Sequence, residues 1–177
     1  MSAKSLGAGM PIAAVTGRAE ILDAAHPGGV GGTFGGSPVA CAAAIEAVNL
    51  IRQPEFLAHA RRLGDVMREV MHGWQKQWPI VGDVRGLGPM MLAEFVKDQK
   101  TKEPATADDT LKIVRQAVAN GVIVMRAGLF SNCVRLLPPL TIPEDMLREG
   151  LDALGRAIEE FGIPNSEFGI RSVHSKF

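Results

Sequence analysis

The strongest constraint on the fold is a pair of amphipathic helices that enclose a run of short apolar segments. Apolar residues recur every three or four positions between Pro54 and Pro79, which is the period of one helix face: Phe56, Ala60, Leu63, Met67, Val70, Trp74 and Trp78. The same period recurs near the C-terminus, at Leu147, Leu151, Leu154, Ile158 and Phe161. Such faces need a partner layer, so the sequence predicts a small α/β domain over residues 54–162.

The segments between these helices predict three or four strands and one further helix. "VGDVRGLGPMMLAEFV" predicts a strand with a glycine-marked bend, and "VIVM" and "NCVRLLP" predict two more. Aspartates in the preceding loop are placed to cap a helix over residues 109–120, which Asn120 and Gly121 end. Thr141 and Glu144 fit a capping box for the final helix.

The first 53 residues have a different character. Two glycine clusters flank one short apolar segment, "PIAAV", which we expect to be a buried strand. A helix is predicted to follow, with Ser37 as N-cap and Pro38 in its first position. The helix carries five alanines, which let another backbone approach closely. We place a domain boundary near Gln53, which divides the chain into residues 1–53 and 54–177.

Composition and charge exclude several classes of function. Nineteen basic residues balance nineteen acidic ones, and no basic cluster indicates a nucleic-acid or membrane-surface partner. No apolar stretch reaches the ~20 residues that a membrane helix needs. Cys41 and Cys133 lie far apart in apolar contexts, which favours two free thiols over a disulfide. We therefore expect a cytoplasmic protein without nucleic-acid or membrane partners.

The common site motifs do not fit this sequence. A dinucleotide-binding fingerprint that starts at Gly7 would need glycine at position 12, which is Ile12. A phosphate-binding loop that starts at Gly31 would need lysine at position 37, which is Ser37. The four histidines include no i, i+4 pair, neither cysteine has a close partner, and no G-x-S-x-G elbow occurs. No metal site is predicted.

One candidate nucleophile is left, Lys4, which lies among small residues beside an apolar segment. Burial disfavours the charged form of lysine, and a neutral amine forms Schiff bases with carbonyl compounds such as pyridoxal phosphate. Its position near the start of the chain favours a solvated, inert lysine instead. The residue taken alone leaves both interpretations open.

The sequence around this lysine resembles a known enzyme family. "AKSLGAGMPIAAVTGRAEI", followed by "GGTFGGSPVACAAA", is similar to the cofactor-lysine region of the class III (ω-amino-acid) aminotransferases, which are fold-type I pyridoxal phosphate enzymes. The resemblance implies that Lys4 carries the cofactor. It also implies that Thr33 donates to the phosphate of the cofactor bound in the neighbouring subunit, and a hydroxyl among glycine N–H groups suits an anion.

A third segment, "NCVRLLPPLTI", places Arg135 where the family has an active-site arginine. In the 4-aminobutyrate aminotransferases this arginine helps to recognise the α-carboxylate of a glutamate-type substrate, and a planar guanidinium matches a carboxylate with two hydrogen bonds. Without the resemblance, Arg135 would be interpreted as an edge-strand arginine that reaches solvent. The "VRGLG" segment also resembles the family and is interpreted as structural.

The resemblance runs from Ser2 to about Glu160 and corresponds to the C-terminal part of these enzymes. It implies an α/β fold in which residues 1–53 are a remnant of the large cofactor-binding domain. Residues 54–177 would then be the small C-terminal domain, with a mostly antiparallel sheet.

The implied reaction moves an amino group from an ω-amino acid of the 4-aminobutyrate type to a keto acid such as 2-oxoglutarate, in a homodimer or higher homo-oligomer. Lys4 would also transfer the proton at the reacting carbon. Specificity for ornithine, acetylornithine or β-alanine stays open.

The alternative is a catalytically incompetent fragment that acts at most as a folded or subunit-association module. The sequence offers no candidate for the phosphate-cradling turn, the aromatic residue over the cofactor ring, the aspartate at the ring nitrogen or a further substrate-binding arginine. We therefore expect these 177 residues to be inactive on their own.

Overall fold

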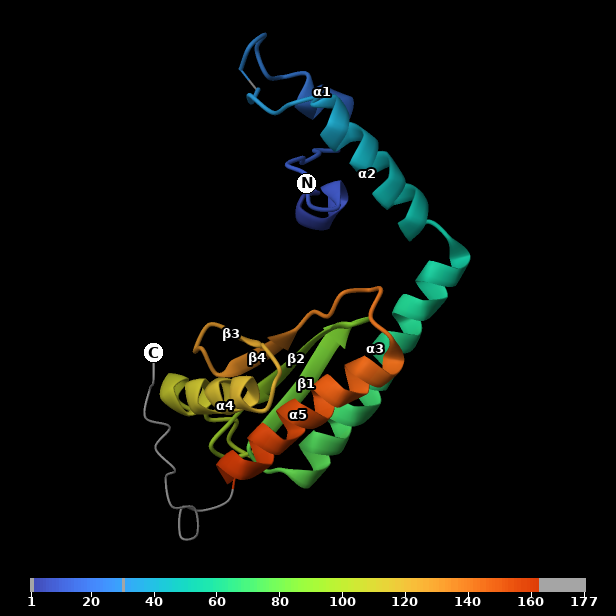
Figure 1. Cartoon of the computed structure of the whole chain (residues 1–177). Coiled ribbons are helices and arrows are strands. Elements are labelled where there is room, and N and C mark those ends of the chain that lie inside the picture. Colours follow the sequence, from blue (N-terminus) through green and yellow to red (C-terminus); the bar gives the residue numbers. More distant parts are fainter. Residues whose placement is uncertain (1, 30, 163–177) are drawn as a thin grey trace, which may run out of the picture. The chain divides into compact units, whose positions relative to one another are not determined.

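The computed structural model describes residues 2–29 and 31–162 (Figure 1). The chain folds into two compact units, Met1–Ala58 and His59–Phe177. Its elements, in chain order, are η1 (Lys4–Gly7), α1 (Ala19–Leu22), α2 (Pro38–Ile51), α3 (Pro54–Gln77), β1 (Val81–Leu87), β2 (Met90–Phe95), α4 (Ala107–Ala119), β3 (Met125–Ala127), β4 (Cys133–Leu136) and α5 (Glu144–Gly162). No helix within these described ranges has the length and apolar content needed to cross a membrane.

The second unit is built on a four-stranded sheet with the order β1-β2-β4-β3. Each neighbouring pair is antiparallel, as predicted. Because directly opposed residues share a face, Val84, Ala93 and Val134 form one row across three strands, and all three are buried. This row lies on the face of the sheet that contributes to the hydrophobic core.

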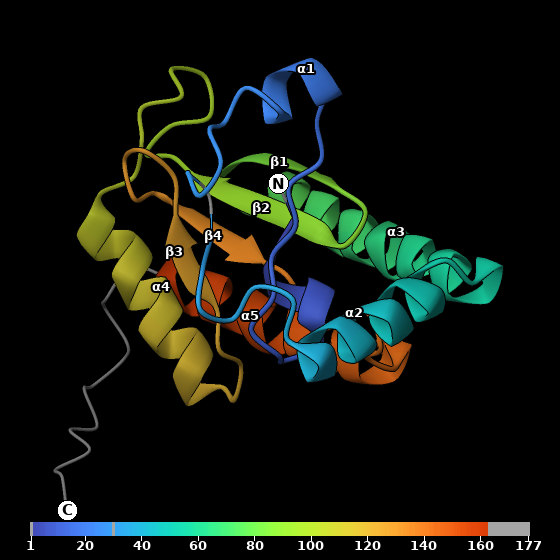
Figure 2. The same ribbon diagram turned by 90° about the horizontal axis from the view of Figure 1, so that it is seen from above.

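Helices α3, α4 and α5 supply the rest of that core. Their buried apolar residues cluster with the sheet: Leu63, Val66, Met67, Met71 and Trp74 from α3, Ile113 and Ala117 from α4, and Leu147, Leu151, Leu154, Ala157 and Ile158 from α5. Helix α4 lies beside α5 and β3 (Figure 2). The predicted amphipathic helices are therefore confirmed, and so is the α/β character of this unit.

Helix α3 approaches the sheet and α5 closely at two glycines. A Cβ at Gly64 would lie 2.5 Å from the carbonyl carbon of Gly88, in the turn between β1 and β2. A Cβ at Gly155 of α5 would lie 3.3 Å from the indole nitrogen of Trp74. Arg62 of α3 also donates to Glu144 of α5, with an Nε–Oε2 distance of 2.9 Å. These contacts fix the helix layer against one face of the sheet and leave the other face uncovered by it.

Two predicted strands have different bounds in the structure. "VGDVRGLGPMMLAEFV" forms a hairpin, β1 and β2, rather than a single bent strand, because the chain reverses at Gly88 and Pro89. The "VIVM" strand was placed too early, since β3 begins only at Met125. Cys133–Leu136 lies inside the predicted "NCVRLLP" strand, which is confirmed.

Two predicted helix caps also differ. Helix α4 begins at Ala107, and Thr106 rather than an aspartate is its cap, because the Thr106 hydroxyl accepts the Asp109 N–H at 3.1 Å. The capping box at Thr141 is wrong, since α5 begins at Glu144. The Glu144 carboxylate instead accepts hydrogen bonds from two arginines, Arg62 and Arg148.

The first unit consists of η1, α1, α2 and the first residues of α3, up to Ala58, with connecting loops. Ser37 precedes Pro38 at the start of α2 as predicted, although its backbone carbonyl, not its hydroxyl, takes part, accepting the Cys41 N–H at 2.9 Å. "PIAAV" forms no ladder and is largely exposed, so the expectation of a buried strand is wrong for this unit. Instead Ala14 pairs with Ser2 through two backbone hydrogen bonds of 2.7 and 2.8 Å.

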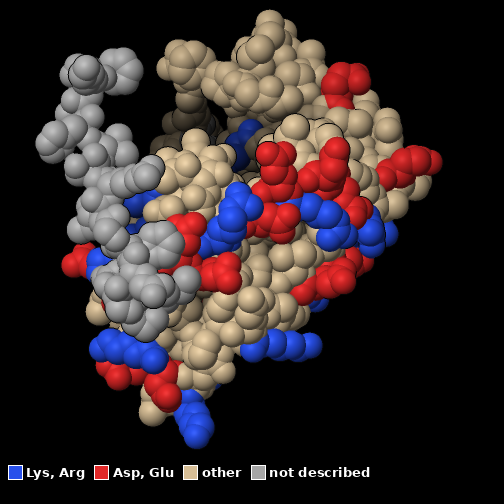
Figure 3. Space-filling model, turned by 60° about the horizontal axis from the view of Figure 1, so that its bottom comes forward, with Lys and Arg blue, Asp and Glu red and all other residues tan. Residues whose placement is uncertain are grey.

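The charged side chains follow the balanced composition. On the face drawn in Figure 3, acidic and basic side chains are intermingled. Cys41 and Cys133 are both free thiols, as the sequence predicts. Burial is the main cause that raises the pKa of the Cys133 thiol.

Candidate active site

Lys4 lies at the start of η1 in an uncommon backbone conformation. Its φ is 57°, in the left-handed region that residues other than glycine rarely adopt. This conformation costs on the order of 1 kcal/mol, so the surrounding contacts must hold it. The Ser2–Ala14 pair anchors the chain before Lys4, and the Ala8 N–H donates to the Ser5 carbonyl after it.

Gly7 closes the turn that follows Lys4. It is buried, and a Cβ at this position would lie 2.6 Å from Cγ2 of Ile12, so only glycine fits. The segment is thus folded back on itself and presents Lys4 on the outside. The Lys4 side chain is exposed.

Thr33 lies in a glycine turn that leads into α2. The Gly35 N–H donates to the Gly32 carbonyl at 3.0 Å, which places Thr33 inside the turn with an exposed side chain. A Cβ at Gly31 or Gly32 would meet nothing within 4 Å. Packing among the described residues therefore does not require glycine there, whereas the close approach of a ligand or another chain would.

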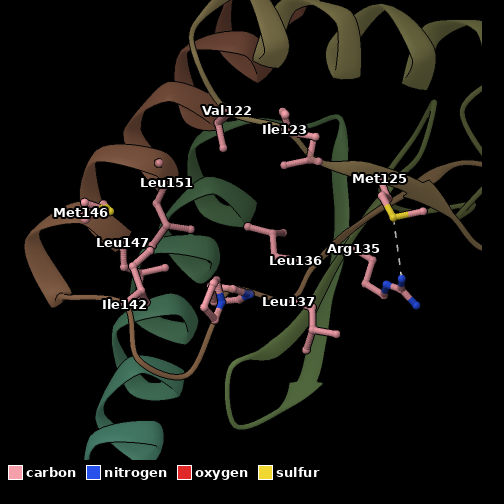
Figure 4. A pocket seen from close by; sticks show the side chains of 14 residues that line it. Val122, Ile123, Met125, Arg135, Leu136, Leu137, Ile142, Met146, Leu147 and Leu151 are labelled. Atoms are coloured by element: carbon pink, nitrogen blue, oxygen red, sulfur yellow. Dashed lines mark hydrogen bonds between the residues drawn. The ribbon is translucent and has the colours of Figure 1, made fainter. Parts of the chain in front are cut away.

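Arg135 lies on an inner strand of the sheet in the second unit. Because β4 pairs with both β2 and β3, the interpretation as an edge-strand arginine is wrong. Arg135 is directly opposite Leu92 on one side and Met125 on the other. It points to the face that α3, α4 and α5 leave uncovered, and its side chain is exposed. Its Nη2 donates to the Met125 sulfur at 3.9 Å (Figure 4).

Arg85 lies in the same cross-strand row, opposite Leu92 on its other side. Unlike Arg135, it donates to two carboxylates, those of Asp83 and Glu94, at 2.6 Å each. These hydrogen bonds, with that of Asp83 the larger, raise the pKa of Arg85. Among residues 2–29 and 31–162, Arg135 has no carboxylate within ion-pair distance.

An apolar pocket of about 390 Å³ opens next to β4, and the sequence did not predict it. It lies between β3, the segment after β4 and α5, and its walls include Leu136, Ile142, Met146 and Leu151 (Figure 4). Leu136 and Arg135 are adjacent in β4 and point to opposite sides of the strand. Arg135 and Met125 nevertheless line the pocket as well, so the pocket extends from the apolar side chains of α5 to the Arg135 side chain.

The structure places the predicted site residues in two groups. Lys4 and Thr33 belong to the first unit, and Arg135 belongs to the second. Their roles in binding and catalysis stay predictions. In the described part of the chain, no group of three or more His, Cys, Asp or Glu side chains is arranged to hold a metal ion.

Comparisons with curated proteins give the same family throughout. Residues 1–158 match the family described as Aminotransferase class-III. The 4-aminobutyrate aminotransferase of Mycobacterium leprae is 44% identical over 160 residues, which are 90% of this chain and 35% of that protein. The 5-aminovalerate aminotransferase DavT of Pseudomonas aeruginosa is 40% identical over 158 residues, which are 89% of this chain and 37% of that protein.

Solved structures agree with this assignment. A Bacillus anthracis aminotransferase matches with a TM-score of 0.67 and 31% identity, over 72% of this chain and 29% of that one. An amine transaminase from an uncultivated Pseudomonas species, in its PLP-bound form, matches with a TM-score of 0.68 and 30% identity, over 75% and 30%. This chain spans about a third of the length of the curated relatives it matches. The predicted fold is confirmed, and the chain belongs to the class III aminotransferase family.

Proposed function

We propose that this chain provides the cofactor lysine and a substrate-binding arginine of a pyridoxal-phosphate-dependent aminotransferase that acts on ω-amino acids. The observation that carries the proposal is the Lys4 segment. Its sequence resembles the family's cofactor-lysine segment, and the backbone holds Lys4 in a left-handed conformation between the Ser2–Ala14 pair and the Gly7 turn. Backbone strain of this kind is concentrated at functional sites.

The residues of the first unit suit pyridoxal phosphate. The exposed Lys4 amine is free to bond to the cofactor's aldehyde carbon, and the exposed Thr33 hydroxyl can donate to its phosphate. The glycines beside Thr33 leave open space for that phosphate, ahead of the positive N-terminal end of α2. When bound, the cofactor supplies an electron sink that makes the carbon bearing the amino group acidic. Once the substrate amine has replaced Lys4 on the cofactor, the released Lys4 Nζ would accept the proton from this carbon and deliver it to the cofactor carbon that had held the lysine.

Arg135 suits the carboxylate of the substrate. Its guanidinium is exposed and contacts a thioether instead of a carboxylate, so it can offer two N–H groups to an incoming anion. Its place on an inner strand fixes its backbone on both sides. Lysine could not reproduce this planar, two-bond contact.

The substrates follow from this arrangement and from the relatives. Two of the relatives are named as aminotransferases of 4-aminobutyrate and 5-aminovalerate, which are both carboxylates with a terminal amine. We propose this class as amino donor, 4-aminobutyrate first, and a keto acid such as 2-oxoglutarate as acceptor. We further propose a homodimer or higher homo-oligomer, in which Thr33 contacts the cofactor of the neighbouring subunit.

A second candidate is an inactive module. The length of the match favours this candidate, because this chain aligns with only 35% of the Mycobacterium leprae relative and 37% of the Pseudomonas aeruginosa relative. In this case the 177 residues would fold and associate with an intact subunit but would not catalyse transamination.

The two candidates are separated by adding the part of a relative that this chain does not match. The N-terminal two thirds of the Mycobacterium leprae relative would be fused before Ser2, and transamination of 4-aminobutyrate would be measured. We expect activity in the fusion, its loss in Lys4→Ala, and its retention in Lys97→Ala, a surface lysine that pairs with Glu103. An active Lys4→Ala fusion would contradict the role of Lys4.

A further inference from the structure

Helix α2 has one face of small side chains, and this face is buried within the first unit. Ala40 and Ala44 are four residues apart, so they lie one turn apart on the same side of the helix, which we call the alanine face. Their exposed fractions are 2% and 9%, whereas most residues of this unit are exposed. Ala42, Glu46 and Asn49 lie on another side of α2 and are exposed.

The turn that carries Lys4 lies against this helix. Residues of η1 and α2 have Cα atoms within 8 Å of one another, and the two elements lie side by side in both ribbon views (Figure 1 and Figure 2). Because the alanine face is the buried side of α2, we place η1 on that face. Alanine has only a methyl side chain, so the η1 backbone can approach the helix closely. The sequence indicated that another backbone approaches these alanines, and η1 is the backbone that does so.

The η1 turn depends on such support because its backbone is strained at both ends. Lys4, its first residue, has a φ of 57°, and Ala8, directly after it, has a φ of 48°. This left-handed region is unfavourable for residues with a Cβ. Two backbone hydrogen bonds close the turn, from the Leu6 N–H to the Ala3 carbonyl and from the Ala8 N–H to the Ser5 carbonyl, and both are long at 3.2 Å. A strained turn persists where the surrounding structure holds it.

We propose that Ala40 and Ala44 are positioning residues for Lys4. They let η1 lie close to α2, and this contact preserves the left-handed backbone that sets the direction of the Lys4 side chain. A larger side chain on the alanine face would push η1 away and let Lys4 return to a common backbone conformation. The Lys4 amine would then leave the place where it meets the cofactor and the reacting carbon. This inference rests on the proposed function, in which Lys4 holds the cofactor and transfers the proton.

The first test needs no cofactor and follows amide hydrogen exchange by mass spectrometry. It uses the fusion in which the N-terminal two thirds of the Mycobacterium leprae relative precede Ser2. Ala44→Leu overpacks the contact, so the amides of residues 4–10 are expected to exchange about tenfold faster. Ala42→Leu, on the exposed side of the same helix, is the matched control and is expected to exchange at the wild-type rate. Equal exchange in Ala44→Leu and the wild-type fusion would overturn the contact.

The second test adds pyridoxal phosphate and separates positioning from a general loss of structure. The value of kcat is expressed per bound cofactor, so unfolded protein does not contribute to it. A misplaced Lys4 slows proton transfer without weakening substrate binding, so Ala44→Leu is expected to lower kcat about tenfold and to leave the KM for 4-aminobutyrate unchanged. Ala44→Ser keeps a small side chain whose hydroxyl can bond to the Ala40 carbonyl, and it is expected to retain the wild-type kcat. Ala44→Val replaces the leucine variant if that variant does not fold.

The outcomes separate this inference from the proposed function. Faster exchange and a lower kcat in Ala44→Leu, with neither change in Ala42→Leu or Ala44→Ser, support the positioning role. Wild-type exchange or an unchanged kcat in Ala44→Leu overturns the role of the alanine face and leaves that of Lys4 intact. A wild-type fusion that binds pyridoxal phosphate without forming a bond from Lys4 would contradict the proposed function, and both proposals about Lys4 would fail.

Discussion

The two units of this chain differ sharply in how much apolar surface they bury. The second unit has a continuous core in which helices from both ends of its sequence meet one sheet face. In the described part of the first unit only Gly7, Ala40 and Ala44 are buried. Its large apolar side chains are mostly exposed: Met10, Val15, Ile21, Leu22, Phe34, Val39, Ile45, Val48, Leu50, Ile51 and Leu57.

This difference bears on what stabilises the folded state of each unit. A segment that buries so little cannot offset the conformational entropy of its own folding. Exposed apolar patches are typical of surfaces that interact with other molecules. The first unit nevertheless contains Lys4 and Thr33. The residues proposed to bind the cofactor thus lie on the unit that buries less apolar surface.

The largest expected effect is a difference in stability between equivalent substitutions in the two units. Leu154→Ala removes a fully buried side chain of α5, and we expect it to lower the free energy of unfolding by about 2–5 kcal/mol. Leu50→Ala removes a side chain of α2 that is 43% exposed. We expect it to change the free energy of unfolding by less than about 0.5 kcal/mol. Urea denaturation measures both. Equal losses would show that the first unit shares the core of the second.

The next effect concerns the affinity for pyridoxal phosphate of the fusion described above, in which the N-terminal two thirds of the Mycobacterium leprae relative precede Ser2. Thr33→Ala removes a hydroxyl that we expect to bind phosphate, so the affinity for pyridoxal phosphate should fall by about 1–3 kcal/mol. Thr16→Ala, also exposed in the first unit, is the control and should leave the affinity unchanged. Cofactor titration followed by visible absorbance gives both values. An unchanged affinity in Thr33→Ala would contradict the phosphate contact.

A smaller effect is expected at Arg135, in the unit that has its own core. Arg135→Lys keeps the charge but loses the planar fork, so the half-reaction with 2-oxoglutarate should slow roughly tenfold. Stability should not change, because the side chain is exposed on the uncovered face. Single-turnover kinetics of each half-reaction, with urea denaturation alongside, test both statements. A stability loss without a kinetic change would make Arg135 structural.

Sequence patterns predicted this molecule best where local rules decide the structure. The helix faces of α3 and α5 follow directly from apolar spacing, and the core confirms them. The hairpin turn at Gly88 was harder to predict, because Gly86 and Gly88 both lie in one apolar segment and either could mark a bend. Glu144 was taken for a capping residue because its partner Arg62 is 82 positions away in the sequence.

The candidate site was predictable only in part. Lys4, Thr33 and Arg135 were found because their segments resemble a family, whereas composition and spacing favoured ordinary surface roles. The left-handed backbone at Lys4 has no signal in its residue type, since lysine does not favour positive φ. The contact between Met125 and Arg135 could not be predicted at all, because it depends on strand register.

The smallest expected effect is a pH dependence within the second unit. Hydrogen bonds from Arg62 first, and then from Arg148, lower the pKa of the Glu144 carboxyl below its ordinary value. A carboxyl whose pKa is lower in the folded state stabilises the fold above its unfolded-state pKa of about 4.3, and this contribution disappears as pH falls through the folded-state pKa. The difference in unfolding free energy between the wild-type chain and Glu144→Gln should therefore be constant near neutral pH and shrink below about pH 4. Glu149→Gln changes an exposed glutamate of the same helix that forms no ion pair with the described residues, and it should show no such pH-dependent difference. Because Glu144 links α3 to α5, a difference that persists unchanged in acid would mean that the carboxylate charge does not contribute to holding these two helices together.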